Sequence, residues 1–394
     1  MSYNQKFIVK SLNKYDKVNF QAEIILKDYD LCDNCLGRLF SRKIGVSSNK
    51  LLGRKIHQSL KKKHYRCYIC KNLLEHLESY EEKLIEKTSG LQFSSFLIGA
   101  ILKPSLIDHD DLVRSKFKLR GIDSIKTDIT KEISKKFARK TKASIEHNSP
   151  DLIITINFKN DSFEFHLKSV FIFGRYLKTE RGFTQKQKQC ENCNGVGCRI
   201  CQFHGLSGFD SVEGKISQFL YKKFGAKQVK ISWIGGEDKS SIVLGNGRPF
   251  FAKIINPAKR KIRIPKKVDL KPIVLQKLKT VNQMPKEPIK FKSIIELSVN
   301  TENEINPTKL KLLKNLKKSP IIVYEKFDKR NEKKVYSINY KKTSSKSFSI
   351  HLKVDGGLPI KKFVDGDNIS PTLTDLLDTK CRCKVFDFHQ IDLQ

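Results

Sequence analysis

Four Cys-x-x-Cys pairs constrain this chain more than any other feature, because they contain eight of its ten cysteines. The pairs are Cys32 and Cys35, Cys67 and Cys70, Cys190 and Cys193, and Cys198 and Cys201. Two such pairs brought together supply four thiolates at tetrahedral positions, which makes a closed structural Zn²⁺ site. The chain is therefore expected to fold around one or two zinc ions.

The two halves of this cysteine set differ in spacing. A stretch long enough to hold a helix separates Cys35 from Cys67, and buried free thiols are the alternative for that cluster. The second cluster, CENCNGVGCRIC (190–201), is compact, and its glycines allow a tight fold. A redox role is disfavoured because neither pair follows a βαβ pattern. Cys381 and Cys383 are two residues apart near a strand, which puts both side chains on the same face, and they are expected to be packing thiols.

The compartment follows from the start of the chain. The N-terminal MSYNQKFIVKSLNKYDK contains no apolar signal segment, so a cytoplasmic location with reduced thiols is expected. No long apolar run suggests a membrane span. No P-loop is present, and no GxGxxG follows a strand, so neither a nucleotide nor another organic cofactor is expected. A monomer is the simplest expectation.

The charge balance indicates a polyanionic partner. The chain has 77 Lys and Arg against 41 Asp and Glu, a formal net charge of +36. Self-repulsion of this size is hard to reconcile with a fold that has no acidic partner, and nucleic acid is the first candidate. Three basic runs, HQSLKKKHYR (57–66), PAKRKIRIPKK (257–267) and KLKLLKNLKK (309–318), favour RNA backbone contacts over ordinary solvated faces.

Hydrophobic patterning predicts an α+β protein with several segments. Residues 1–78 read as a zinc-binding helical segment. Residues 79–182 alternate strand, helix, strand and strand, with strands at 96–102, 151–158 and 162–174. Residues 183–210 form a four-cysteine loop or linker. Residues 211–394 read as a further domain with a helix at 216–224, a strand at 229–234 and two short strands around Gly245-Asn246-Gly247.

Two adjacent acids follow the strand at 229–234, in the stretch WIGGEDKSSIVLGNGRPF (233–250). Catalytic groups are commonly placed where a rigid strand ends in a loop. A single carboxylate such as Asp238 suffices if the chemistry is nucleophilic. The alternative is that Asp238 only caps the turn through its side chain.

This stretch resembles the catalytic segment of one pseudouridine synthase family, the archaeal and eukaryotic enzymes that isomerise uridine at positions 54 and 55 in the T arm of tRNA. Further matching pieces are CDNC, CYIC, PDLIITINF, FGRYLKTERG (173–182), KVYSINY (334–340) and LPIKKFVDGD (358–367). The resemblance covers roughly residues 30 to 390. It implies a zinc-binding N-terminal module with a THUMP-type RNA-binding fold. A synthase domain follows, built on a mixed, mostly antiparallel sheet with flanking helices.

The resemblance also assigns site residues. Asp238 matches the catalytic aspartate, Tyr336 the tyrosine that stacks on the target base and takes part in proton transfer, and Lys361 a basic partner that keeps Asp238 ionised. Ile360 and Phe386 match apolar walls of the substrate site. Gly236 departs from the family, which often has Arg before the Glu-Asp pair.

That departure assigns the role of the missing Arg to Lys239 or Arg248, which makes Arg248 an expected substrate-binding residue. Two other functions compete with the tRNA pseudouridine synthase that the resemblance implies. A non-catalytic tRNA-binding or maturation protein on the same scaffold would also keep the basic surface, and Gly236 supports it. A THUMP-linked thiolation or methylation enzyme would need a Gly-rich cofactor loop that the sequence lacks.

Overall fold

The computed structural model describes residues 14–45, 48–325 and 330–394, so most of the N-terminal stretch used to infer the compartment lies outside the described residues. The chain divides into two compact units, Met1–Leu167 and Lys168–Gln394. Each unit has its own hydrophobic core. No helix in the described part of the chain combines the length and apolarity needed to cross a membrane.

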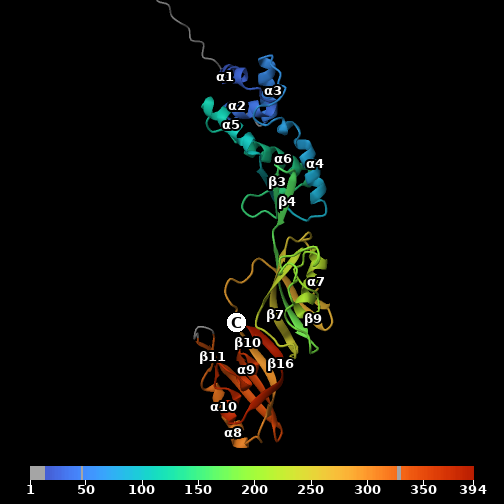
Figure 1. Ribbon diagram of the computed structural model, residues 1–394, viewed down its shortest axis with the longest axis vertical. Coiled ribbons are helices and arrows are strands. Elements are labelled where there is room, and N and C mark those ends of the chain that lie inside the picture. Colours follow the sequence, from blue (N-terminus) through green and yellow to red (C-terminus); the bar gives the residue numbers. More distant parts are fainter. Residues whose placement is uncertain (1–13, 46–47, 326–329) are drawn as a thin grey trace, which may run out of the picture. The chain divides into compact units, whose positions relative to one another are not determined.

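The first unit is a helical segment followed by a small sheet (Figure 1). Its helices are α1 (Lys14–Asp28), α2 (Asp33–Ile44), α3 (Asn49–Ser59), the 3₁₀ turn Leu73–Glu75, α4 (Leu77–Thr88), α5 (Pro104–Lys116) and α6 (Ile125–Thr141). Its strands are β1 (Ser95–Ile101), β2 (Ser144–Ile145), β3 (Leu152–Asn157) and β4 (Ser162–Leu167), in the order β2-β1-β3-β4. Helix α6 packs on β1 and α4 packs on α6, so one face of the sheet is covered.

Two glycines let α2 and α3 approach each other closely. A Cβ on Gly37 would lie 1.8 Å from the Asn49 carbonyl oxygen, and one on Gly53 would lie 1.9 Å from that of Asp33. Any larger residue at either position would therefore push the helices apart. This contact fixes the helix that carries Cys35.

The second unit is a large mixed sheet with helices around it. Its strands are β5 (Val170–Lys178), β6 (Gln228–Trp233), β7 (Val243–Ile255), β8 (Lys267–Asp269), β9 (Ile273–Val281), β10 (Phe291–Thr301), β13 (Val335–Ser344), β14 (Ser347–Asp355) and β16 (Cys381–Leu393). They pair in the order β13-β14-β10-β16-β7-β5-β9-β8, with β6 also paired to β7. The pairs are antiparallel except β16 with β7, which confirms the mixed, mostly antiparallel sheet.

Shorter elements complete this unit. They are α7 (Val212–Phe224), α8 (Pro307–Leu312), the 3₁₀ turn Leu313–Lys317, β11 (Ile321–Tyr324), β12 (Arg330–Lys333), α9 (Ile360–Asp365), β15 (Ile369–Ser370) and α10 (Leu373–Leu377). Helix α7 ends as its sequence predicts, with Gly225 in the left-handed conformation. The basic run 309–318 buries Leu310, Leu313 and Leu316 and exposes its lysines.

Two expectations from the sequence differ from the structure. The stretch 162–174 is two strands, because the chain leaves the small sheet at Leu167 and β5 joins the large sheet of the second unit. Strand β5 therefore belongs to the second unit, whereas the sequence placed it in the segment 79–182. The stretch 242–255 contains one strand, in which Gly245 and Gly247 take positive φ and form an irregularity inside the strand where a hairpin turn was expected.

Candidate active site

The two adjacent acids after β6 differ in burial. The side chain of Glu237 is fully buried, whereas that of Asp238 is 30% exposed. Asp238 lines a pocket of about 360 Å³ whose other walls are largely apolar. The apolar lining residues are Phe291, Ile295, Leu358, Pro359, Ile360, Phe386 and Phe388. An ionised group in a pocket with largely apolar walls is suited to chemistry on a bound ligand.

Asp238 is held as a carboxylate by three donors. Lys361 Nζ lies 2.9 Å from Oδ2, and the backbone N–H and hydroxyl of Ser240 donate to Oδ1 over 2.9 and 2.6 Å. Burial alone would raise the pKa of Asp238, but the hydrogen bonds from Ser240 and Lys361 outweigh it and lower the pKa to about 2. The expected pairing with Lys361 of α9 is thus present, and Asp238 is ionised at neutral pH.

Glu237 is the centre of a buried charge cluster that the sequence did not reveal. Its carboxylate lies 3.3 Å from Lys178 Nζ of β5 and 3.4 Å from Arg248 Nε of β7. Both cations are also buried. Burial lowers the pKa of Lys178, while Glu237 acts to raise it. One buried carboxylate between two buried cations satisfies the requirement that buried charges be paired.

Arg248 is committed to this cluster. Besides Glu237, its Nη1 donates to the carbonyl oxygen of Ile234 over 3.1 Å, and its guanidinium lies 4.2 Å from the centre of the Phe388 ring. Arg248 lines the pocket, although only 1% of its surface is exposed. A side chain fixed in this way is poorly placed to replace the family Arg missing at Gly236. Lys239, which is exposed, stays available for that role.

Residues 178–185 hold the loop that carries Asp238 by bonding to its carbonyl oxygens. Lys178 Nζ donates to the Asp238 carbonyl over 3.0 Å, and the Gly182 N–H donates to that of Lys239 over 2.7 Å. Arg181 bonds the carbonyl of Ser240, and Gln185 bonds that of Gly235. The loop backbone is therefore fixed at four points.

Arg181 also joins this segment to β16. Its two terminal nitrogens each lie 2.6 Å from an oxygen of Asp387, and Asp387 Oδ1 accepts from the Ile242 N–H. Lys178 lies in the segment FGRYLKTERG (173–182), and nothing in that local sequence shows that its side chain is buried.

Tyr336 lies beside the pocket. Asp355 lines the pocket, but Tyr336 is not among the described residues that line it. The Tyr336 hydroxyl donates to Asp355 Oδ1 over 2.9 Å, and Lys292 Nζ lies 4.0 Å from the centre of its ring. Stacking of this ring on a base in the pocket would therefore require a movement. Ile360 and Phe386, by contrast, are buried and line the pocket where the resemblance placed them.

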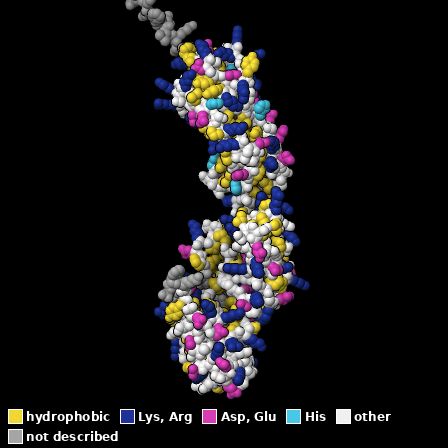
Figure 2. Space-filling view, in the orientation of Figure 1, with side chains coloured by type: hydrophobic (Ala, Val, Ile, Leu, Met, Phe, Trp, Pro, Cys, Tyr) yellow, Lys and Arg dark blue, Asp and Glu magenta, His cyan; other side chains and the backbone are white. Residues whose placement is uncertain are grey.

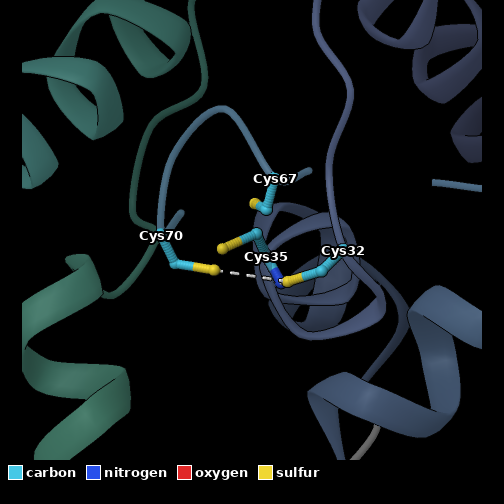
Figure 3. Close-up of side chains that lie close together, drawn as sticks. All are labelled: Cys32, Cys35, Cys67 and Cys70. Carbon is cyan, nitrogen blue, oxygen red and sulfur yellow. Dashed lines mark hydrogen bonds between the residues drawn. The ribbon is translucent and has the colours of Figure 1, made fainter. Parts of the chain in front are cut away.

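The first cysteine tetrad lies in the core of the first unit (Figure 3). Cys32, Cys35, Cys67 and Cys70 are all buried, and their sulfurs lie within 4.8 Å of one another. Cys32 and Cys70 sulfurs are 3.6 Å apart, close to the spacing of about 3.8 Å that tetrahedral Zn–S bonds of 2.3 Å require. The neighbouring Cys32 thiol raises the pKa of Cys35, because negative charges at this distance repel each other. A bound cation is therefore needed to hold several of these cysteines as thiolates.

The second tetrad clips a loop of the second unit. Cys190, Cys193, Cys198 and Cys201 also place their sulfurs within 4.8 Å of one another. The Cys201 sulfur lies 3.8 Å from those of Cys193 and Cys198 and accepts from the backbone N–H groups of Cys198 and Gly205. Such N–H donors stabilise thiolates, so this tetrad too could hold a metal ion. His204 instead contacts the Lys227 carbonyl oxygen.

Comparisons with known proteins agree with this architecture. Residues 171–392 match the family described as Pus10, C-terminal, and residues 80–157 match the archaeal Pus10 THUMP domain. A relative from Nitrosopumilus maritimus, named tRNA pseudouridine synthase Pus10, is 51% identical over 97% of this chain and 100% of its own length. A relative of the same name from Cenarchaeum symbiosum is 37% identical over 93% of this chain and 91% of its own length.

Among solved structures, a Cbf5–Nop10–Gar1 complex matches 45% of this chain and 44% of that chain at 11% identity. Its TM-score of 0.27 is too low to support an inference. The mixed sheet and the THUMP domain define a THUMP-containing enzyme of the pseudouridine synthase class. Within that class, the chain belongs to the Pus10 family.

Proposed function

We propose that this protein is a tRNA pseudouridine synthase that isomerises uridine at position 54, position 55 or both in the T arm. The observation that carries the proposal is the ionised Asp238 carboxylate at the wall of an apolar pocket, held by Lys361 and Ser240. A uridine in folded tRNA must be unstacked and flipped before such a pocket can receive it. Lys and Arg side chains spread over both units supply phosphate contacts (Figure 2).

In the proposed reaction the bond between C1′ of the ribose and N1 of uracil breaks. Asp238 either attacks C1′ or stabilises the positive charge that develops on the sugar. The detached base rotates, C5 bonds to C1′, and the proton on C5 is lost to a base. Tyr336, bonded to the carboxylate of Asp355 at the pocket wall, is the proposed participant in that proton transfer. The C1′–C5 bond replaces the C1′–N1 bond, and N1 takes up a proton from water in place of the one lost from C5, so no co-reactant is needed.

We also infer that both cysteine tetrads hold structural Zn²⁺. Four sulfur ligands leave no open position, so neither ion would take part in the chemistry. The first ion would stabilise the fold of the N-terminal unit, and the second would fix the loop 190–201.

The direct test measures tritium release from tRNA that carries uridine labelled at C5. Wild-type protein should release tritium into water, and Asp238→Asn should bind the same tRNA without releasing it. Substrates with cytidine at position 54 or 55 assign the site. Tight binding with no release by the zinc-loaded wild type on several tRNAs would instead favour a non-catalytic tRNA-binding protein.

Gly236 offers a gain-of-function version of this test. A Cβ at this position would meet only Gln185 Oε1, at 3.9 Å, so a side chain fits without strain. Gly236→Arg restores the residue that the family often has before the Glu-Asp pair. If Arg helps to hold the flipped nucleotide, the variant should lower KM for tRNA, with Gly236→Ala as the control.

A further inference from the structure

The loop of the second tetrad exposes three large apolar side chains within eight residues. Val196 is 76% exposed, Ile200 75% and Phe203 51%. These three residues are called the apolar tip below. Phe203 takes a positive φ of 65°, which is uncommon for a bulky residue outside glycine-rich turns. The backbone is therefore strained at Phe203, a residue whose side chain is exposed to water.

The loop is anchored, so the apolar tip cannot simply fold back onto the protein. The ring of His204 stacks on Tyr221 of α7, with centroids 3.8 Å apart and an interplanar angle of 13°. The amide of Gln228 of β6 donates to the Val196 carbonyl oxygen. The four cysteine sulfurs close the loop from the inside. A rigid loop that holds apolar groups in water is typical of a surface that binds a partner.

The surroundings of the apolar tip favour RNA as that partner. Lys186, Lys188 and Arg199 are exposed on or next to the loop. A pocket of about 460 Å³ lies between the loop and β6, and its lining includes Lys230 and Trp233. Three glutamine residues, Gln187, Gln189 and Gln228, also line it. The amides of Gln187 and Gln228 are already bonded to Asp210 and to the Val196 carbonyl oxygen. Cations for phosphates and an indole ring for base stacking form a set suited to single-stranded nucleotides.

We propose that the apolar tip and this pocket form a second RNA contact, which binds unstacked nucleotides of the tRNA away from the Asp238 pocket. The inference rests on the proposed function, because it takes tRNA as the polyanion that the chain binds. Phe203 would stack on a base face, while Val196 and Ile200 would pack against its neighbours. Three side chains are too few for a stable protein interface, which buries about 800 Å² on each partner.

The test measures equilibrium binding of an unmodified tRNA to full-length, zinc-loaded protein over a range of salt concentrations. All variants carry Asp238→Asn so that no turnover occurs. Ile200→Ser combined with Phe203→Ser should weaken binding about ten- to a hundredfold, because base stacking on exposed side chains contributes this much. The slope of log K against log salt should not change, since no phosphate contact is lost. Arg199→Ala should instead reduce that slope by about one.

Two controls separate this contact from other effects. Leu112→Ser, at a 48% exposed leucine of α5, should leave affinity unchanged, and all variants should melt at the wild-type temperature. Wild-type affinity in the Ile200 and Phe203 double variant would overturn the inference, as would a change only in its self-association. If protein with Asp238 intact releases tritium while the Ile200 and Phe203 double variant binds with wild-type affinity, the proposed function is supported and the second RNA contact is rejected. Failure of the wild type both to bind and to react would reject both proposals.

Discussion

The two units of this protein each contain a cysteine tetrad, but they place it differently. In the first unit all four cysteines are buried and come from the start of α2 and from the segment after α3, so the tetrad joins parts of the core. In the second unit the tetrad spans only residues 190–201 and three of its cysteines are partly exposed. The core of that unit near the pocket contains the Lys178, Glu237 and Arg248 cluster instead.

With zinc bound as proposed, the same ligand set would serve two purposes. The buried tetrad would substitute for hydrophobic contacts that a small helical segment cannot supply alone. The peripheral tetrad would fix a surface loop and leave the rest of its unit independent of the metal. The buried charge cluster, in turn, holds the loop that carries Asp238.

The largest effect should come from Cys35→Ser in the buried tetrad. Loss of one thiolate removes a structural zinc site, whose apparent binding free energy is about 10–16 kcal/mol and comparable to the stability of a whole domain. The chain should contain one zinc ion fewer, and amides of α2 to α4 should lose protection in hydrogen exchange. Cys383→Ser, outside both tetrads, is the control. Retained protection in α2 would show that the first unit does not depend on its metal.

The next largest effect should come from Lys178→Met in the charge cluster. This change removes the donor to the Asp238 carbonyl and leaves Glu237 with Arg248 alone. Displacement of a catalytic group by about 1 Å can cost about a hundredfold in rate, so kcat for tritium release should fall by about that factor. Affinity for tRNA should not change. Lys222→Met, at an exposed lysine of α7, is the control and should leave kcat unchanged.

A purely structural role for Lys178 would give a different pattern. Thermal stability and tRNA affinity would then fall together with kcat. The charge cluster would in that case have no specific role in holding the loop that carries Asp238. The same pair of measurements on wild type and variant decides between the two.

A smaller effect is expected from Cys198→Ser in the exposed tetrad. The zinc content should again fall by one ion per chain, but hydrogen exchange in β7 and β10 should match the wild type. Affinity for tRNA should fall about tenfold, because the loop no longer presents its apolar side chains in one conformation. Unfolding of the whole second unit in this variant would break the comparison between the two tetrads.

The smallest effect is expected from Lys361→Met, and it should depend on pH. Without Lys361, the pKa of Asp238 rises from about 2 toward the ordinary value of about 3.9. The active carboxylate is therefore present in both proteins at pH 7. As the pH falls to 4, kcat of the variant should drop by about half while the wild type stays unchanged. An identical pH profile in the two proteins would show that Ser240 alone keeps Asp238 ionised.

Much of this arrangement could be predicted from residues close together in the sequence. The cysteine spacing predicted both tetrads, and Gly225 predicted the end of α7. The family pattern brought Asp238, Ile360, Lys361 and Phe386 to one pocket. These features depend on short motifs or on whole-family resemblance.

Other features depend on long-range pairing and could not be predicted in this way. Whether Glu237 or Asp238 faces the interior is decided by Lys178 and Arg248, which come from β5 and β7. The Gly-Asn-Gly stretch has the composition of a hairpin turn, yet it lies inside β7, where a Cβ on Gly245 would collide with the carbonyl oxygen of His389. The boundary after Leu167 falls inside a stretch with the appearance of one strand.

The position of β16 has a consequence for how the protein is made. This strand lies between β7 and β10 and carries Phe386 and Phe388, yet it is synthesised long after the strands that it joins. A chain cut before residue 381, through premature termination or proteolysis, would lack the middle of its sheet and a wall of the pocket. It would still contain most of the lysines. Such a fragment would keep most of the positive charge that attracts RNA but would lack a complete pocket.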